Sequence, residues 1–114
     1  MEIAKTLGGD YELKIVEGYP PMNNHPEVVA QLKTVIGELI GMDKIVEPEP
    51  EMGAEDFGFF IRDIPGAMFF LGCKIEENPR RHHDSKFDIN EDCMPIGAAI
   101  LAQSALQFLN SHVP

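Results

Sequence analysis

The chain has 114 residues, of which 44% are hydrophobic and 25% are charged, and its formal net charge is −10. This length is that of a single domain, and the composition excludes the highly charged, poorly hydrophobic kind of disorder. Nineteen acidic against nine basic side chains repel phosphate polymers and anionic lipid, so the sequence disfavours nucleic acid and membrane surfaces as partners.

The N-terminal sequence and the cysteines both indicate a cytoplasmic location. The first ten residues, MEIAKTLGGD, have no positive region followed by an apolar run, and no later segment is long enough to span a bilayer. Cys73 and Cys93 form no C-x-x-C motif and are too few for a disulfide framework. We therefore expect a cytoplasmic protein with two reduced, buried thiols.

The first elements in chain order are a short helix and a strand. Residues 1–7 predict a short helix that ends at the sequence GGD, because glycine readily adopts the left-handed backbone conformation that commonly follows the last helical turn. Residues 11–17 alternate apolar and charged side chains, which is typical of a strand with one solvated face.

A longer helix is expected to begin at Pro26, with Asn24 or His25 as its N-cap. Its apolar residues recur at helical spacing and form one face: Val28, Val29, Leu32, Val35, Ile36, Leu39 and Ile40. Gly41 is expected to end it.

The second half is expected to combine strands with a packing helix. Residues 44–47 predict a short strand, and a helical turn begins near Ala54. The sequence GAMFFLGC at residues 66–73 is an apolar run bounded by glycines, which is typical of a central strand covered on both faces. Residues 92–111 predict a buried helix rich in alanine. This order of elements indicates an α/β fold with some parallel pairing.

A polar loop, RHHDSKFDINED at residues 81–92, holds side chains of the types that bind metals. Adjacent histidines cannot lie on one face of an element, so at most one of His82 and His83 points into a given site. Asp84 and Asp88 are near enough in sequence to accept the second N–H of a metal-bound imidazole. The alternative is that both histidines are solvated, because zinc needs three or four ligands and this loop offers one convincing donor.

A second candidate site is the turn MGAEDFGFF at residues 52–60. Here Gly53 and Ala54 precede Glu55 and Asp56, which could begin a helix whose free N–H groups bind a substrate carboxylate. The structural alternative is that the two acids simply occupy the first helical turn, where the helix dipole favours them. The residue types alone favour this alternative.

Three stretches taken together resemble a known family. They are YPPMNNHPEVVAQL at residues 19–32, MGAEDFGFFIRDIPGAMFFLG at 52–72 and HHDSKFDINEDCMPIGAAILAQSALQFL at 82–109. Their order and their amino-acid sequences resemble the C-terminal part of the metal-dependent aminoacylase and carboxypeptidase family. The resemblance points to the branch of hippurate hydrolases, N-acyl-amino-acid amidohydrolases and plant auxin-conjugate hydrolases.

The resemblance implies an α/β fold that is part of a phosphorylase/hydrolase-like catalytic domain, in which helices pack on a central sheet. Residues 1–18 would be the last helix and strand of a ferredoxin-like lid or dimerisation domain. Residues 19–114 would be the C-terminal portion of the catalytic domain. The implied partners are a small N-acyl amino acid or peptide substrate, and either further copies of the chain or the missing N-terminal half.

The resemblance also implies one metal ligand in this chain. In the family a metal-binding histidine stands four residues before the phenylalanine of an F-D-x-N-E segment, which corresponds to His83 before Phe87. His82 and Asp84 would be neighbours that position this ligand. The turn at the active-site wall would contact substrate through Gly53, Ala54 and Glu55, and no catalytic residue is assigned.

Two departures from the family pattern bear on activity. Ser85 stands where relatives usually have proline, so the loop is expected to be looser. An H-x-C-G-H-D-like motif, a glutamate ligand beside the glutamate base and a further histidine are not found in these 114 residues. In the complete enzyme, zinc, manganese or cobalt would polarise the amide carbonyl and activate water, while the glutamate moves the proton. This chain alone need hold no metal and is expected to be inactive.

Two other functions stay open. A non-catalytic interaction or oligomerisation module could keep the fold and bind a partner through exposed apolar surface. A small metal-buffering protein could use His25, His82, His83 and the acidic loop, although this set provides few ligands.

Overall fold

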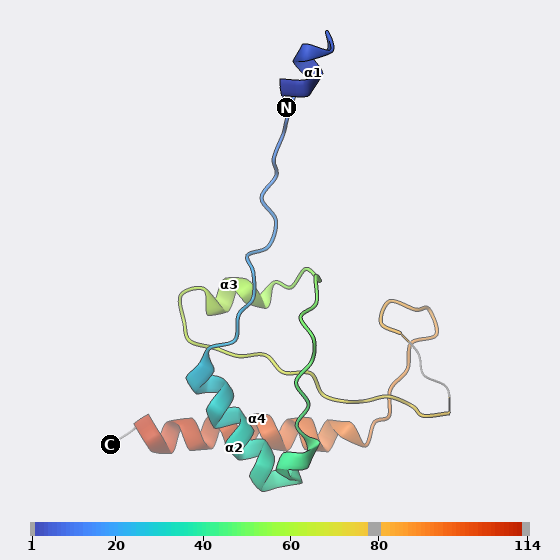
Figure 1. The fold of residues 1–114 in the computed structure, drawn as a ribbon. Helices are drawn as coiled ribbons and strands as arrows, with labels where there is room; N and C mark the ends of the chain where they lie inside the picture. The colour runs from blue at the N-terminus through green and yellow to red at the C-terminus, as the bar shows by residue number, and fades with distance from the viewer. Residues whose placement is uncertain (1, 78–80, 113–114) are drawn as a thin grey trace.

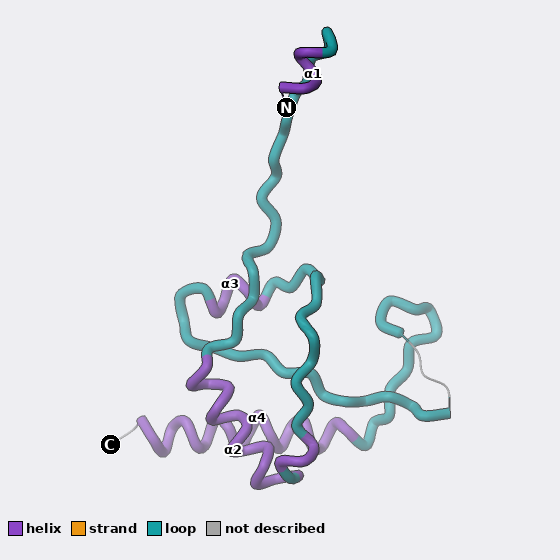
Figure 2. The backbone as a smooth tube through the Cα atoms, in the orientation of Figure 1, coloured by secondary structure: helices purple, strands orange, loops and turns teal. Residues whose placement is uncertain are grey.

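Helices are the regular secondary structure in residues 2–77 and 81–112, the part of the chain that the computed structural model describes (Figures 1 and 2). The two long helices pack against each other, and the first of them also contacts a short 3-10 helix. In chain order the elements are α1 (Glu2–Thr6), α2 (Pro26–Ile40), the 3-10 helix η1 (Met42–Lys44), α3 (Phe57–Ile61) and α4 (Cys93–His112). None of these helices combines the length and the apolar character that a membrane span requires.

Both ends of α2 lie where the sequence predicts. His25 is the N-cap residue, although its side chain makes no capping hydrogen bond, and Pro26 opens the first turn. Gly41 ends the helix with a φ of +99°, a conformation that glycine adopts at little cost, and its N–H donates to the carbonyl of Gly37 at 3.1 Å.

The short helix α1 also ends at its predicted glycine. Gly8 has a φ of +79°. Its N–H donates to the carbonyl of Lys5 at 3.0 Å, and the N–H of Gly9 donates to that of Ala4 at 2.9 Å. This pair of bonds is the Schellman arrangement, which satisfies the last carbonyls of a helix.

The core lies between α2 and α4. Val35 and Ile100 are 1% and 2% exposed, and Cys93 is also buried. Elsewhere along α4 the large apolar side chains are open to solvent, as for Leu101, which is 62% exposed. The helix predicted for residues 92–111 therefore forms, but it buries one stripe rather than its whole circumference. Of the two thiols expected to be buried, Cys93 is buried and Cys73 is half-buried, and both are free.

We expect Ile100→Ala to destabilise the packing of α2 on α4 by about 2–5 kcal/mol, because it removes a fully buried side chain and leaves a cavity. The neighbouring change Leu101→Ala, on the exposed side of the same helix, should stay within about 0.5 kcal/mol. Urea unfolding followed by far-ultraviolet circular dichroism measures both. Equal losses for the two variants would contradict this packing.

The sheet predicted from the sequence is not present in the described residues. Residues 11–17 and 66–73 are extended, as their patterns predict, but neither pairs with another segment as a strand (Figure 2). At residues 44–47 the chain leaves η1 and becomes extended, and Glu47 forms an ion pair with Lys33 of α2. A strand is stabilised by hydrogen bonds and side-chain contacts with its neighbours, which a local pattern does not specify. The α/β sheet and the ferredoxin-like lid are therefore not confirmed.

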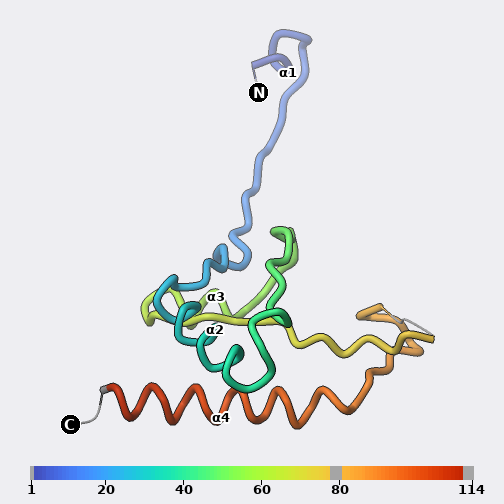
Figure 3. The backbone as a smooth tube through the Cα atoms, turned by 60° about the horizontal axis from the view of Figure 1, so that its bottom comes forward, coloured from blue at the N-terminus to red at the C-terminus, as the bar shows by residue number. Residues whose placement is uncertain are grey.

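The N-terminal segment projects away from the helical body as an arm (Figures 1 and 3). Residues 10–18 are exposed throughout, including the apolar side chains that alternate along residues 11–17. The domain boundary expected at residue 18 stays a prediction. That the arm is the remnant of a lid domain stays a prediction.

Hydrogen bonds hold one end of the extended segment 66–73 against the start of α2. The side-chain amide of Asn24 donates to the carbonyl of Met68 at 2.8 Å and accepts from the N–H of Met68 at 2.9 Å. The N–H of His25 donates to the carbonyl of Gly66 at 2.9 Å. Asn24, one of the two predicted helix caps, is thus used to fix a segment that is distant in sequence.

The other end of this segment is fixed near the start of α4. The N–H of Asn90 donates to the carbonyl of Cys73 at 2.9 Å. Between the two ends, Leu71 packs on α4 beside Gly97, where an added Cβ would come within 2.8 Å of the Leu71 Cδ2 atom. The segment is therefore stretched across the helices.

We expect Asn24→Ala to release Met68, because it removes both side-chain hydrogen bonds, each worth about 0.5–1.5 kcal/mol. Hydrogen exchange of the Met68 amide should become faster. Asn24→Asp should keep part of the protection, since a carboxylate still accepts from this amide but cannot donate to the carbonyl. Asn23→Ala, at the exposed neighbouring residue, is the control and should leave the exchange rate unchanged.

Candidate functional site

Hydrogen bonds within the loop shape residues 81–92. The N–H of Asp84 donates to the carbonyl of Arg81 at 3.3 Å, and the N–H of Phe87 donates to the carbonyl of Asp84 at 3.0 Å. The Asp84 carboxylate accepts from the N–H of Lys86 at 2.8 Å, which is the bond of an Asx turn. The loop is therefore a series of turns that support one another.

The two adjacent histidines of this loop have different surroundings. The ring of His82 meets that of Phe87 edge to face, with centroids 5.2 Å apart and planes at 82°, a favourable arrangement for aromatic rings. His83 is exposed, and its φ of +65° is uncommon for any residue but glycine, although histidine tolerates it better than most. No hydrogen bond or ring contact engages the His83 imidazole within residues 2–77 and 81–112. This ring is therefore available to a ligand.

His82 and Asp84, which were expected to position His83, make contacts with other residues. Asp84 uses its carboxylate within the turn, and His82 contacts Phe87. No group of three or more His, Cys, Asp or Glu side chains comes together to hold a metal ion within the described ranges 2–77 and 81–112. The residues described here therefore do not fit a complete metal centre, and the loop provides one unengaged imidazole.

In the turn at residues 52–60, the first backbone N–H of α3 already has a hydrogen-bond acceptor within the chain. The Glu55 carboxylate accepts from the N–H of Phe57 at 3.0 Å, and the carbonyl of Asp56 accepts from the N–H of Phe59 at 3.0 Å. Glu55 is half-buried, whereas Gly53 and Ala54 are exposed. The structural alternative places both acids in the first helical turn, whereas both precede α3 and Glu55 binds the first N–H of the helix from outside it.

We expect Glu55→Ala to fray α3, because the Phe57 amide loses its acceptor and a missing cap costs about 0.5–2 kcal/mol. Hydrogen exchange at the Phe57 amide should accelerate. Asp56→Ala is the matched control, since the Asp56 side chain makes no capping bond and its backbone carbonyl is retained. If Asp56→Ala has the larger effect, the cap is wrongly assigned to Glu55.

The structure does not bring the two candidate sites together. The loop at residues 81–92 and the turn at residues 52–56 are separate in both Figure 1 and Figure 3. His83 and the predicted substrate contacts Gly53, Ala54 and Glu55 therefore do not share a cleft in the described chain.

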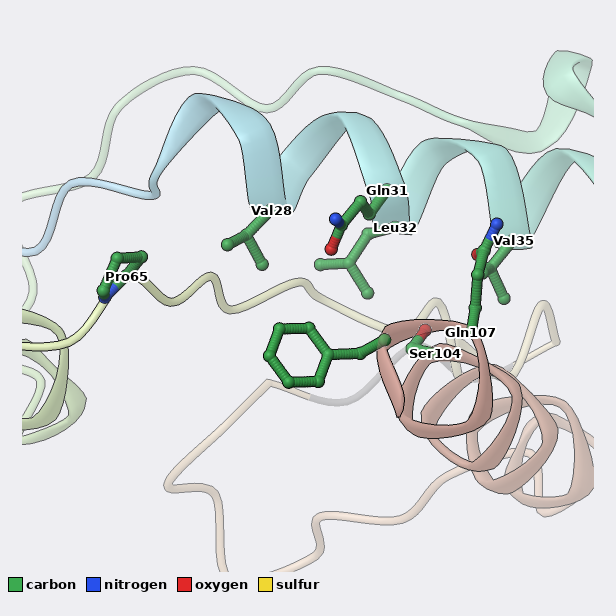
Figure 4. A pocket seen from close by; sticks show the side chains of 8 residues that line it. Val28, Gln31, Leu32, Val35, Pro65, Ser104 and Gln107 are labelled. Carbon is green, nitrogen blue, oxygen red and sulfur yellow. The ribbon is translucent and has the colours of Figure 1, made fainter. Parts of the chain in front are cut away.

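A hollow that the sequence did not predict lies between α2 and α4 (Figure 4). Its volume is about 140 Å³, and the Gln107 Oε1 atom beside it is buried without a hydrogen-bond partner in the described residues. The helical periodicity of both elements predicts that they pack, but not that they leave a void. The residues around it are Val28, Gln31, Leu32, Val35, Pro65, Ser104, Gln107 and Phe108.

The family of the chain follows from its match to a family model. Residues 3–107 match the model of peptidase family M20/M25/M40. The chain belongs to this family. The resemblance seen in the three sequence stretches is thereby confirmed.

Individual relatives agree with the M20 assignment. The chain is 36% identical over 108 residues to the putative amidohydrolase YhaA of Bacillus subtilis, covering 93% of this chain and 27% of the relative. It is 42% identical over 94 residues to the IAA-amino acid hydrolase ILR1-like 2 of Arabidopsis thaliana, covering 82% and 21%. It is 37% identical over 111 residues to thermostable carboxypeptidase 1 of Saccharolobus solfataricus, covering 95% and 28%. This M20 chain thus spans about a quarter of the length of its relatives.

Proposed function

We propose that the chain is part of a metal-dependent amidohydrolase that cleaves the amide bond of N-acyl amino acids or small peptides. The observation that carries this proposal is the family match over residues 3–107. The relatives are named as an amidohydrolase, an amino acid hydrolase and a carboxypeptidase, and hydrolysis of a C–N amide bond is the chemistry that these names share.

His83 is the residue by which this chain contributes to the metal centre. Its exposed, unengaged imidazole supports this role, whereas the ring of His82 packs on Phe87. Zinc, manganese or cobalt would need further donors, because a zinc site takes three protein ligands or more. In this proposal those donors belong to polypeptide outside the chain; the described residues gather no group of three or more metal-ligating side chains.

The turn at Gly53 and Ala54 forms part of the substrate pocket in this proposal. Both residues are exposed, and an added Cβ at Gly53 meets no atom within 4 Å, so a substrate can approach the backbone. Glu55 holds the turn in place through its bond to the Phe57 amide. Glu55 thus supports the contact surface while its carboxylate remains engaged.

The second candidate is a non-catalytic interaction module. Exposed apolar side chains favour it, among them Leu13 and Ile15 of the arm and Phe60 and Phe70 of the body. Apolar surface of this extent drives association, with a second copy or with another chain. Hydrolysis of N-acyl amino acids by this chain joined to the rest of an M20 hydrolase distinguishes the two candidates, because only a part of the enzyme would support it.

Two assays test the proposal. The isolated chain, supplied with zinc, manganese or cobalt, should not hydrolyse N-acyl amino acids. A chimera in which this chain replaces the matching part of the Bacillus subtilis relative should hydrolyse them. In that chimera His83→Ala should lower kcat/KM at least about 100-fold and reduce the metal content, since changes to residues that only support a ligand already cost about 10–100-fold.

His82→Ala is the matched control in the chimera, because it removes an adjacent imidazole that packs on Phe87. It should cost less than the change at His83 and leave the metal content intact. Chelator-sensitive turnover by the isolated chain, abolished by His83→Ala, would refute the dependence on further polypeptide. Equal losses for the two histidines would refute the assignment of the ligand.

A further inference from the structure

The hollow between α2 and α4 has the size and the lining of a site for a small apolar ligand (Figure 4). Its volume of about 140 Å³ is close to that of an engineered apolar cavity, about 150 Å³, that binds benzene in another protein. Five of the eight residues around the hollow are apolar, and none of the eight carries a charge. A charged molecule would lose its hydration here without gaining an ionic partner, so the lining favours a neutral ligand.

A hydrogen-bond acceptor beside the hollow has no donor. The Gln107 side chain extends from α4 toward Val35 of α2 (Figure 4), and its Oε1 atom is buried without a hydrogen-bond partner in the described residues. Buried polar atoms are normally hydrogen-bonded, because leaving one unpaired is unfavourable. A ligand that donates a hydrogen bond to Gln107 would therefore gain affinity.

The hydroxyl group of Ser104, which also lines the hollow, can act only as an acceptor toward a ligand. Its Oγ atom donates its one hydrogen to the carbonyl of Ile100 at 2.7 Å. Ser104 and Gln107 are three residues apart on α4 and therefore lie on the same side of the helix. A water molecule could donate to them, but the apolar remainder of the lining offers few of the two to four partners that a buried water usually has.

We propose that the hollow binds a neutral molecule made of a single aromatic ring with one hydrogen-bond donor, which donates to the Gln107 Oε1 atom. The ring would lie against Val28, Leu32 and Val35 of α2 and would contact both long helices at once. The lining includes no residue of the loop at 81–92 or of the turn at 52–60. The inference therefore goes beyond the proposed function and does not rest on it.

Phenol is the probe for this site, and toluene, which has nearly the same shape and no donor, is the control ligand. Titration of the 114-residue chain with phenol should shift the methyl NMR signals of Val28, Leu32 and Val35 and should saturate. The expected dissociation constant is about 1 mM, a value within reach of so small a ligand. Phenol should also raise the midpoint of thermal unfolding as its concentration rises, because it binds the folded state.

Gln107→Leu removes the acceptor and retains a side chain of similar size. It should weaken the binding of phenol about three- to tenfold, the effect of one hydrogen bond, without weakening that of toluene. Gln103→Leu is the matched control, since Gln103 is an exposed residue of the same helix outside the lining. It should leave both affinities unchanged. Circular dichroism of the two variants shows whether the helices are retained.

A loss of affinity that is confined to phenol in Gln107→Leu supports the inference, whether or not the chain takes part in hydrolysis. Titration without saturable shifts would overturn it, because the hollow would then hold water alone. Equal weakening of phenol and toluene by Gln107→Leu would show that the acceptor is not used and would overturn it as well. The chimera with the Bacillus subtilis relative should give the same phenol shifts, and their loss there would mean that other polypeptide fills the hollow, which also refutes the site.

Discussion

The packing of α2 against α4 is the contact on which the arrangement of the other segments depends. Val35 and Ile100 are the large side chains most completely removed from water in the described residues. The two helices come from distant parts of the sequence, and their contact creates the surface over which the extended segments run. Hydrophobic burial at this one contact therefore supports the body, while the arm contributes exposed surface.

Hydrogen bonds from residues next to α2 and α4 hold the extended segment at residues 66–73 against this helix pair. Asn24 and His25 lie at the start of α2, Asn90 lies just before α4, and between them they hold residues 66–73 at both ends. These bonds act on the backbone groups of Gly66, Met68 and Cys73. Fixing both ends of the segment restricts the backbone conformations that residues 66–73 can adopt.

The helix ends could be predicted because the residues that begin or end a helix lie within a few positions of that end. Pro26 opens α2, and Gly8 and Gly41 close α1 and α2 with positive φ angles, as the sequence indicated. The strands were predicted from equally local patterns, but a sheet depends on neighbours, and the described residues include no paired strand. The role of Asn24 was missed for a similar reason, because its partner Met68 is 44 residues away.

The candidate site was predictable only in part. The residue types favoured a place for Glu55 and Asp56 in the first helical turn, whereas Glu55 precedes α3 and accepts from the N–H of Phe57. No local pattern distinguishes His83 from His82 as a ligand, and this choice came from resemblance to a family. The backbone of His83 and the packing of His82 on Phe87 make the two residues different in a way that spacing alone does not.

The hydrogen-bonded turns of the loop at residues 81–92 bear on whether the loop folds before or after a metal ion binds. Zinc fingers fold only when their metal binds, because the ion replaces a hydrophobic core. Here backbone and side-chain hydrogen bonds around Asp84 link residues 81–87 into successive turns. In the metal-dependent hydrolase that we propose, a chelator would therefore remove the cation and leave these turns in place, and resupply of the metal would restore the activity.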